Sequence, residues 1–268
     1  MRKINILNIQ MQSKISDKQS NLDKIKKFIE NNNDNKLDLV VMPEFFNTGI
    51  SHNAFIKLAE SEEGNFETIT FLSELAKKYN TNILCGSIIE REQDKLYNTS
   101  YFLNRSGEII GKYRKIHLFN YFGGTEGKLI SSGDQHIVIN TDIGKIGLGI
   151  CFDIRYPIHF YNLMKMGAEI IVLPTAWLAF KDDNIDYVKD NWINFNKVRA
   201  SENLLYVISS NQYGKIDSRL SAIGHSLVVN PKGEVVSIIE DEQTAKLVTI
   251  DLDDVDKIRK ECPINRLN

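Results

Sequence analysis

The pattern of apolar and polar positions divides the chain into amphipathic helices and short strands. Apolar residues recur at helical spacing in several segments, and Ser20 stands where an N-cap of the first segment is expected. This spacing predicts helices over residues 20–31, 66–76, 156–166 and 190–203, with a short helix after Asp253. Apolar or alternating runs predict strands over residues 4–10, 37–42, 83–89, 96–103, 108–116, 136–139, 146–150, 170–173, 204–209, 224–229, 235–239 and 247–250.

The order of these elements predicts a mixed α/β fold. Strands alternate with helices early in the chain, and hairpins follow, the first across residues 104–107. About a dozen strands exceed what one twisted sheet carries comfortably. We therefore expect two sheets packed face to face with helices outside them. Because no linker, repeat or break in composition interrupts the pattern, we expect one domain over residues 1–268.

Composition limits the classes of function. Of the 268 residues, 42% are hydrophobic and 25% are charged, as in ordinary globular proteins. The net charge of −2 gives no electrostatic reason to bind nucleic acid or an anionic membrane. No apolar run approaches the roughly 20 residues of a membrane span, and the N-terminal segment does not resemble a secretion signal. The cysteines are odd in number and far apart, which predicts a reducing cytoplasm: Cys85, Cys151 and Cys262.

Cys151 is the first candidate for chemistry. The apolar run over residues 146–150 leads directly into it, and polar or turn-forming residues follow. A thiol at the end of a buried strand can be held rigidly and still reach a substrate. A lone cysteine is nevertheless more often a core residue, and reactivity requires surroundings that favour the thiolate. A nucleophilic role for Cys151 therefore depends on partners elsewhere in the chain.

Two other predicted strand ends carry such partners. Glu44 follows the strand over residues 37–42 and is flanked by aromatic residues, so desolvation would raise its proton affinity toward that of a useful base. Lys115 closes an extended segment, and its ammonium can stabilise an oxyanion. Cys151 then needs Glu44 to accept its proton or the charge of Lys115 to favour the thiolate. Singly, Glu44 and Lys115 are typical of surface residues and Cys151 of a core residue; together the three predict a catalytic centre.

Three other patterns carry less weight. Gly224-His-Ser226 lacks the second glycine of a serine-hydrolase turn and leads into a strand. Gly144, Gly147 and Gly149 are in the wrong order for a dinucleotide-binding loop. The five histidines show no metal-ligand spacing, and no metal site is predicted from them: His52, His117, His136, His159 and His225.

Six motifs span nearly the whole chain: Met42-Pro-Glu-Phe45, Leu96-Tyr-Asn-Thr-Ser100, Tyr113-Arg-Lys-Ile-His-Leu-Phe119, Gly149-Ile-Cys-Phe-Asp-Ile-Arg-Tyr-Pro157, Arg199-Ala-Ser-Glu-Asn203 and Gly224-His-Ser-Leu-Val-Val-Asn-Pro-Lys-Gly-Glu234. In these motifs and in their order, the sequence resembles the nitrilase superfamily of carbon–nitrogen hydrolases. The resemblance implies a four-layer α-β-β-α sandwich, usually dimerised, and no metal or organic cofactor. It also implies a Glu-Lys-Cys triad, which falls on Glu44, Lys115 and Cys151.

The resemblance further implies a mechanism. Cys151 would attack an amide carbonyl while Glu44 takes its proton, and Lys115 with the backbone N–H of Phe152 would hold the oxyanion. Water activated by Glu44 would then hydrolyse the thioester. A second glutamate often accompanies the triad, and Glu126 is the matching position. It would hydrogen-bond Lys115 or position substrate; the alternative is an acid in a loop that faces solvent.

The substrate is less sharply indicated. The nucleophile motif looks most like the amidase branch that includes omega-amidases, which hydrolyse the terminal amide of 2-oxo dicarboxylic acid monoamides. Arg155 would pair with a substrate carboxylate, or with Asp153 to brace the nucleophile turn. Trp177 would line the acyl pocket or pack in the core. Phe152 replaces a common tyrosine, which leaves the acyl specificity open. The rival hypotheses are an N-carbamoyl amidohydrolase and an inactive member that acts as a scaffold.

Overall fold

Strand β1 (Lys3–Gln10) has apolar residues on both faces, which places it between two layers. This computed structural model describes residues 2–32, 36–121 and 123–264. Ile4 and Ile6 belong to the core between the two main sheets, whereas Leu7 and Ile9 pack with helices. Because successive side chains of a strand point to opposite faces, this alternation builds two cores from one strand. The predicted domain limits at residues 1 and 268 lie outside the described residues.

The first main sheet has seven strands, and its centre is parallel. β1 pairs in parallel with β2, and β2 pairs in parallel with β3, while β16 pairs with β1 in the antiparallel direction. The predicted hairpin across residues 104–107 is confirmed, since β5 pairs with β6. The strands that join β1 here are β2 (Leu39–Val41), β3 (Asn82–Leu84), β4 (Ile88–Glu92), β5 (Lys95–Leu103), β6 (Ile109–Arg114) and β16 (Thr244–Asp251).

The second main sheet has six strands, and β8, β9 and β11 run parallel at its centre. Its strands are β7 (Val138–Thr141), β8 (Gly144–Leu148), β9 (Ile170–Thr175), β11 (Tyr206–Asn211), β14 (Ser226–Val229) and β15 (Val235–Ile239). A third sheet of three short strands was not predicted and consists of β10 (Leu178–Phe180), β12 (Tyr213–Lys215) and β13 (Leu220–Ile223).

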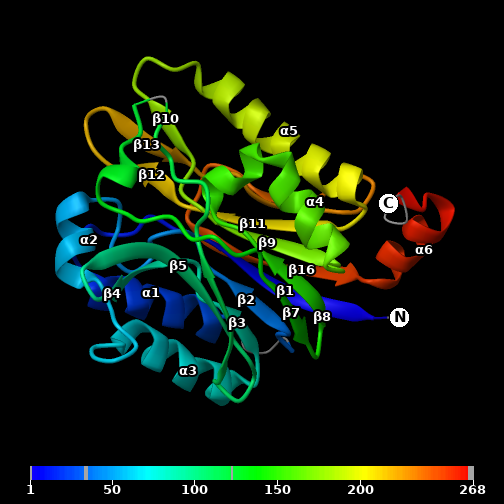
Figure 1. Cartoon of the computed structure of the whole chain (residues 1–268), viewed down its shortest axis with the longest axis horizontal. Coiled ribbons are helices and arrows are strands. Elements are labelled where there is room, and N and C mark those ends of the chain that lie inside the picture. The colour runs from blue at the N-terminus through cyan, green and yellow to red at the C-terminus, as the bar shows by residue number, and fades with distance from the viewer. Residues whose placement is uncertain (1, 33–35, 122, 265–268) are drawn as a thin grey trace.

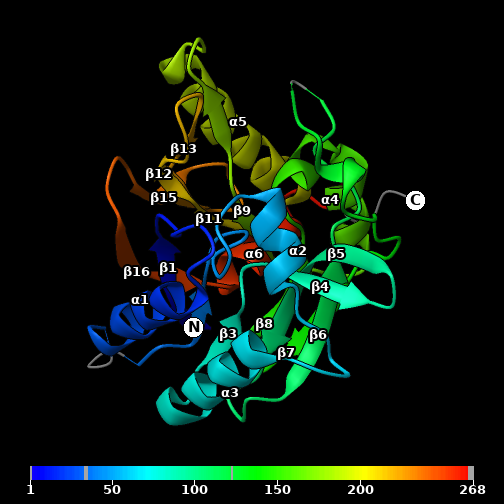
Figure 2. The same ribbon diagram turned by 90° about the vertical axis from the view of Figure 1, so that its left-hand side faces the viewer.

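Helices cover the outer faces of the two main sheets, as predicted. In Figures 1 and 2, α1 and α3 lie on one side of the stacked sheets and α4 and α5 on the other. The layers therefore form an α-β-β-α sandwich. The helices are α1 (Lys18–Glu30), α2 (His52–Leu58), α3 (Glu67–Tyr79), α4 (Pro157–Lys165), α5 (Ile185–Asn203) and α6 (Asp253–Glu261), with 3-10 turns η1 (Glu126–Lys128) and η2 (Cys151–Arg155). Among the described residues, no helix combines the length and apolar character needed to cross a membrane.

Three predicted boundaries are wrong for identifiable reasons. The first helix starts earlier than predicted, because Asp17 is its N-cap and accepts a hydrogen bond from the backbone N–H of Ser20 at 3.1 Å. α5 starts at Ile185 and not at residue 190, because Asn184 caps it. The predicted strand over residues 83–89 is interrupted between β3 and β4, which both pair with β5.

Gly86 explains that interruption and bears on the site. Its φ of +53° is one that L side chains rarely adopt, and an added Cβ would lie 2.2 Å from the carbonyl oxygen of Pro43. The missing side chain thus lets the loop after β2 pack tightly against this bend. Since Glu44 follows Pro43 directly, Gly86 helps to fix the position of that glutamate.

Candidate active site

The parallel strands of the two main sheets bring their carboxyl ends together, and the predicted residues lie there. Glu44 follows β2 of the first sheet, whereas Cys151 follows β8 of the second. The backbone N–H of Glu44 donates to the carbonyl of Thr175 at the end of β9, at 3.3 Å, which ties one sheet to the other. Ligand sites of open α/β sheets commonly lie at the carboxyl ends of strands.

Glu44 is a buried carboxylate surrounded by hydrogen-bond donors. Its Oε1 accepts from Lys115 Nζ at 2.9 Å and from Asn98 Nδ2 at 2.8 Å, and its Oε2 accepts from the backbone N–H of Ala176 at 2.8 Å. Burial raises the pKa of Glu44, and the nearby charge of Glu126 adds to this while Lys115 opposes it. A carboxylate with raised proton affinity, held rigidly, has the properties of a general base.

Lys115 lies between two carboxylates. Its Nζ donates to Glu44 Oε1 at 2.9 Å and to Glu126 Oε2 at 2.8 Å, and only 2% of its side chain is exposed. Burial by itself opposes the charge, but Glu126 and Glu44 outweigh it and raise the pKa of Lys115 well above its ordinary value. The raised pKa favours the charged form of Lys115, which suits a cation that stabilises an oxyanion and not a proton acceptor.

Glu126 makes the hydrogen bond to Lys115 that the resemblance implied and does not face solvent as a loop acid. It lies in η1, with 9% of its side chain exposed, and its Oε2 also accepts from the backbone N–H of Phe119 at 2.7 Å. Its Oε1 accepts from Asn98 Nδ2 at 3.0 Å. Glu126 and Glu44 are thus joined twice, by Lys115 and by Asn98.

Asn98 is a residue of the site that was not predicted. It lies on β5 with no exposed surface, and its amide nitrogen donates to both carboxylates of the site. The available signal was a polar residue within a strand that is otherwise buried. An amide side chain has no acid–base chemistry of its own. The position of Asn98 in the sequence therefore could not distinguish a residue of the site from a structural asparagine.

Cys151 stands at a sharp turn between β8 and η2. β8 ends at Leu148, so the cysteine follows the strand and opens the 3-10 turn, and its φ of +48° lies in the left-handed region. That conformation is strained for a residue other than glycine and is often found at functional sites. Burial raises the pKa of the Cys151 thiol well above its ordinary value; Glu44 adds to this, and Lys115 opposes it. The resting residue is therefore a neutral thiol.

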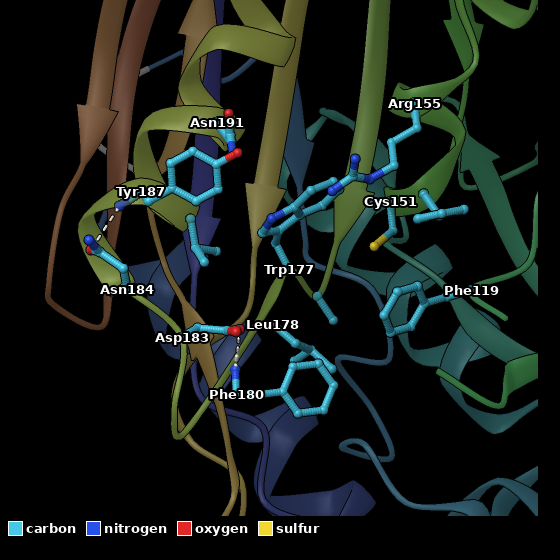
Figure 3. A pocket seen from close by; sticks show the side chains of 13 residues that line it. Phe119, Cys151, Arg155, Trp177, Leu178, Phe180, Asp183, Asn184, Tyr187 and Asn191 are labelled. Atoms are coloured by element: carbon cyan, nitrogen blue, oxygen red, sulfur yellow. Dashed lines mark hydrogen bonds between the residues drawn. The ribbon is translucent and has the colours of Figure 1, made fainter. Parts of the chain in front are cut away.

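A pocket of about 400 Å³ opens beside Cys151. Figure 3 shows the sulfur of Cys151 pointing into it, with Phe119 and Arg155 nearby and Trp177 across from the thiol. The predicted substrate-binding residues Phe152, Arg155 and Trp177 all line this pocket. The Arg155 guanidinium lies over the ring of Trp177, 5.2 Å from the ring centroid. The Trp177 ring also packs on the ring of Trp192, with the two ring centroids 4.9 Å apart.

The far wall of the pocket was not predicted. It comes from the start of α5 and includes Asp183, Asn184, Tyr187 and Asn191. Figure 3 shows these side chains opposite Cys151. The apolar spacing predicts a helix only from residue 190, so most of this wall lies outside the predicted helix. The signal that could have found it was Asn184, whose side chain caps the helix by accepting from two backbone N–H groups.

Asp153 interacts with a histidine and a tyrosine. Its carboxylate accepts from Tyr113 Oη at 2.6 Å, from His117 Nδ1 at 2.7 Å and from the backbone N–H of Ile150 at 2.8 Å. His117, Asp153 and His159 also bring three potential metal ligands within 4.8 Å of one another. The prediction of no metal-ligand grouping among the histidines missed this cluster, because its members are far apart in the sequence.

Comparisons with known proteins identify the family to which this chain is similar. The carbon-nitrogen hydrolase family matches residues 8–260. A chloroplastic omega-amidase of Arabidopsis thaliana is 32% identical over 94% of this chain and 69% of its own length. A deaminated glutathione amidase of Dictyostelium discoideum is 30% identical over 98% of this chain and 94% of its own length.

The fold agrees as well. The crystal structure of Saccharomyces cerevisiae Nit3, a member of branch 10 of the nitrilase superfamily, is similar with a TM-score of 0.87 and 30% identity. The similarity covers 98% of this chain and 95% of that chain, which confirms the predicted sandwich. The family match over residues 8–260 shows that this chain belongs to the carbon–nitrogen hydrolases of the nitrilase superfamily.

Proposed function

We propose that this protein is an amidase that cleaves a terminal amide of a small molecule through a thioester on Cys151. One observation carries the proposal: the Lys115 ammonium is held at 2.9 Å from Glu44 and 2.8 Å from Glu126 beside a buried cysteine at the pocket. A base, a fixed cation and a thiol in one buried group are what nucleophilic attack on an amide requires.

In the acylation step, Glu44 accepts the thiol proton as Cys151 Sγ bonds to the amide carbonyl carbon. Because burial disfavours the thiolate, this proton transfer must accompany the attack. The negative oxygen that forms is stabilised by the Lys115 ammonium and by the backbone N–H of Phe152. The carbon–nitrogen bond then breaks, Glu44 returns the proton to the leaving nitrogen, and ammonia departs.

In the deacylation step, a water molecule attacks the thioester carbonyl carbon, and Glu44 takes one of its protons. Lys115 again faces the developing oxyanion. The carbon–sulfur bond breaks, the carboxylic acid leaves, and the proton on Glu44 returns to Cys151. Glu126 keeps Lys115 charged and aligned throughout, since it accepts from Nζ at 2.8 Å. No metal or organic cofactor takes part in either step.

We propose a 2-oxo dicarboxylic acid monoamide as the substrate. Arg155 lines the pocket near the thiol, and a guanidinium binds a carboxylate in bidentate fashion. The similarity to an omega-amidase supports this choice. The similarity to a deaminated glutathione amidase is equally extensive and makes deaminated glutathione the second candidate substrate.

Ammonia release from a panel of amides tests the function. The panel contains 2-oxo dicarboxylic monoamides, deaminated glutathione, simple aliphatic amides and N-carbamoyl amino acids. The largest kcat/KM is expected for a 2-oxo dicarboxylic monoamide. Release from carbamoyl compounds alone would favour the N-carbamoyl amidohydrolase. A folded protein that releases ammonia from none of them would favour the inactive scaffold.

Replacing Arg155 with methionine is expected to raise KM for amides that carry a carboxylate by roughly 10- to 100-fold, the factor that corresponds to a lost charged hydrogen bond. kcat/KM for a neutral aliphatic amide should stay unchanged, because the reacting groups are not touched. Arg91→Met, on β4, serves as the control. Equal losses for charged and neutral amides would show that Arg155 does not recognise the carboxylate.

We further propose one domain that forms a homodimer in the cytoplasm. The outer face of α4 and α5 supports the dimer, since Ile158 is 67% exposed and Val198 is 49% exposed there. Three cysteines without a disulfide support a reducing compartment. Sedimentation equilibrium measures the mass in solution, and a mass of one chain at micromolar concentration would contradict the dimer.

A further inference from the structure

Asp153 is a buried carboxylate that the proposed reaction does not use. It lies two residues after Cys151 in η2, has no exposed surface and is absent from the pocket lining. A buried carboxylate is costly unless several donors compensate it. The donors around Asp153 come from two separate segments, and each segment carries one residue of the proposed triad.

On the nucleophile side, Asp153 fixes the turn that holds Cys151. Its Oδ2 accepts from the backbone N–H of Ile150 at 2.8 Å, directly before the cysteine. Ile150 is extended, with φ of −135°, whereas Cys151 has φ of +48°. A change of backbone conformation between two neighbours needs such external support, because the left-handed region is unfavourable for cysteine.

On the other side, Asp153 holds both flanks of Lys115. Tyr113 Oη donates to Oδ2 at 2.6 Å, and His117 donates to Oδ1 through its backbone N–H at 3.1 Å and its Nδ1 at 2.7 Å. Tyr113 and His117 are each two residues from Lys115. His117 is itself held by stacking on Tyr156, with ring centroids 3.6 Å apart.

We propose that Asp153 is a positioning residue that locks the Cys151 turn to the segment carrying Lys115. The inference rests on the proposed function, because it concerns how Cys151 and Lys115 are aligned for the proposed amide hydrolysis. One carboxylate sets the distance between the sulfur that attacks and the ammonium that meets the oxyanion. Burial by itself would raise the pKa of Asp153, but the hydrogen bonds from His117, Tyr113 and the backbone of Ile150 together with nearby His159 lower that pKa below its ordinary value, which favours the charged carboxylate.

The neighbouring histidines favour this role over metal binding. His117 Nδ1 already donates to Asp153, His159 Nε2 is 3.1 Å from the carbonyl of Leu148, and His159 Nδ1 is 3.0 Å from His136 Nδ1. Because both ring nitrogens of His159 are engaged, a cation could bind His159 only by displacing one of these contacts. The hydrogen bonds around Asp153 are already in place without a cation.

Asp153→Asn tests the inference, with Asp142→Asn as the matched control. Asp142 pairs with Arg105 and Asn82 far from the pocket. For Asp153→Asn, kcat should fall about 100-fold with KM unchanged, because a displacement of about 1 Å disturbs the reacting groups and not the pocket. Tyr113→Phe removes one donor and should give a smaller loss. Asp142→Asn should leave both constants unchanged.

A second measurement separates positioning from mere stability. The rate of alkylation of Cys151 by iodoacetamide is followed against pH by peptide mass spectrometry, on protein whose folded fraction is known from circular dichroism. The midpoint should be displaced in Asp153→Asn, since the thiol then meets Glu44 and Lys115 in a different geometry. A folded variant with wild-type kcat and midpoint, or one with a lowered melting temperature alone, would overturn the proposal.

These outcomes are distinct from failure of the proposed function. A wild-type protein that hydrolyses no amide counts against the amidase, whereas the alkylation profile needs no substrate and still tests Asp153. Dialysis against a chelator should leave wild-type activity and midpoint unchanged. Activity that is lost on chelation and returns only with added Zn²⁺ would overturn positioning in favour of a metal site.

Discussion

Replacing Cys151 with alanine is expected to lower amide hydrolysis by at least about 10⁴-fold while the fold persists. The loss is large because, without the Cys151 thiol, no nucleophile is present to attack the amide carbonyl carbon beside Glu44 and Lys115. The fold should persist because alanine keeps the Cβ and removes only one sulfur at the pocket wall. Ammonia release measures the loss, and circular dichroism with thermal unfolding measures the fold.

The other two thiols are internal controls. Burial raises the pKa of Cys85 to about 12, which leaves it unreactive, and Cys262 is exposed. Cys262→Ala should retain wild-type turnover. A slowly hydrolysed amide should leave its acyl group on the peptide that contains Cys151. Turnover retained in Cys151→Ala, or an acyl group on Cys262, would contradict the assignment of the nucleophile.

Replacing Lys115 with methionine is expected to cost about 3–5 kcal/mol of stability at pH 7 and to abolish turnover. The substitution leaves Glu44 and Glu126 as two buried carboxylates with no cation between them. Burial and Glu126 already raise the pKa of Glu44 above its ordinary value of 4.5, and removal of Lys115 raises it further. Urea unfolding at intervals of about one pH unit, from about pH 4 to about pH 8, measures the change.

The sign of the pH dependence follows from that raised pKa. A group whose folded pKa exceeds its unfolded value stabilises the fold below the unfolded pKa, and this contribution is lost as pH rises through the folded pKa. The stability deficit of Lys115→Met should therefore be small at about pH 4, close to the ordinary pKa of a carboxyl group, and should grow toward neutral pH. Lys112→Met, which removes a partly exposed lysine from Glu62 and Glu90, is the control.

A companion variant sharpens this test. Adding Glu126→Gln to Lys115→Met should restore part of the stability at neutral pH, because one buried charge is gone. Turnover should stay absent, since the oxyanion still lacks its cation. A deficit that is independent of pH, or one that the second substitution deepens, would show that lost packing and not unpaired charge is responsible.

The sequence by itself determined the main layers and the residues of the proposed triad. The apolar residues of strands such as β1 and β9 are buried on both faces. Such strands can be recognised from their sequence whichever elements pack beside them. Glu44, Lys115 and Cys151 were found because each lies at a predicted strand end and matches a motif. Strands of three or four residues, as in the sheet of β10, β12 and β13, carry too few positions to show a period.

Only the tertiary structure decided how these residues work together. Asn98 on β5 bridges Glu44 and Glu126, and Asp153 joins the Cys151 turn to the flanks of Lys115. The hydrogen bonds that define both roles cross from one part of the chain to another. Local propensity contains no information on such contacts, because they arise when the carboxyl ends of two sheets meet. Sequence therefore pointed to the proposed reacting groups, and packing of the two sheets set the geometry and surroundings of these groups.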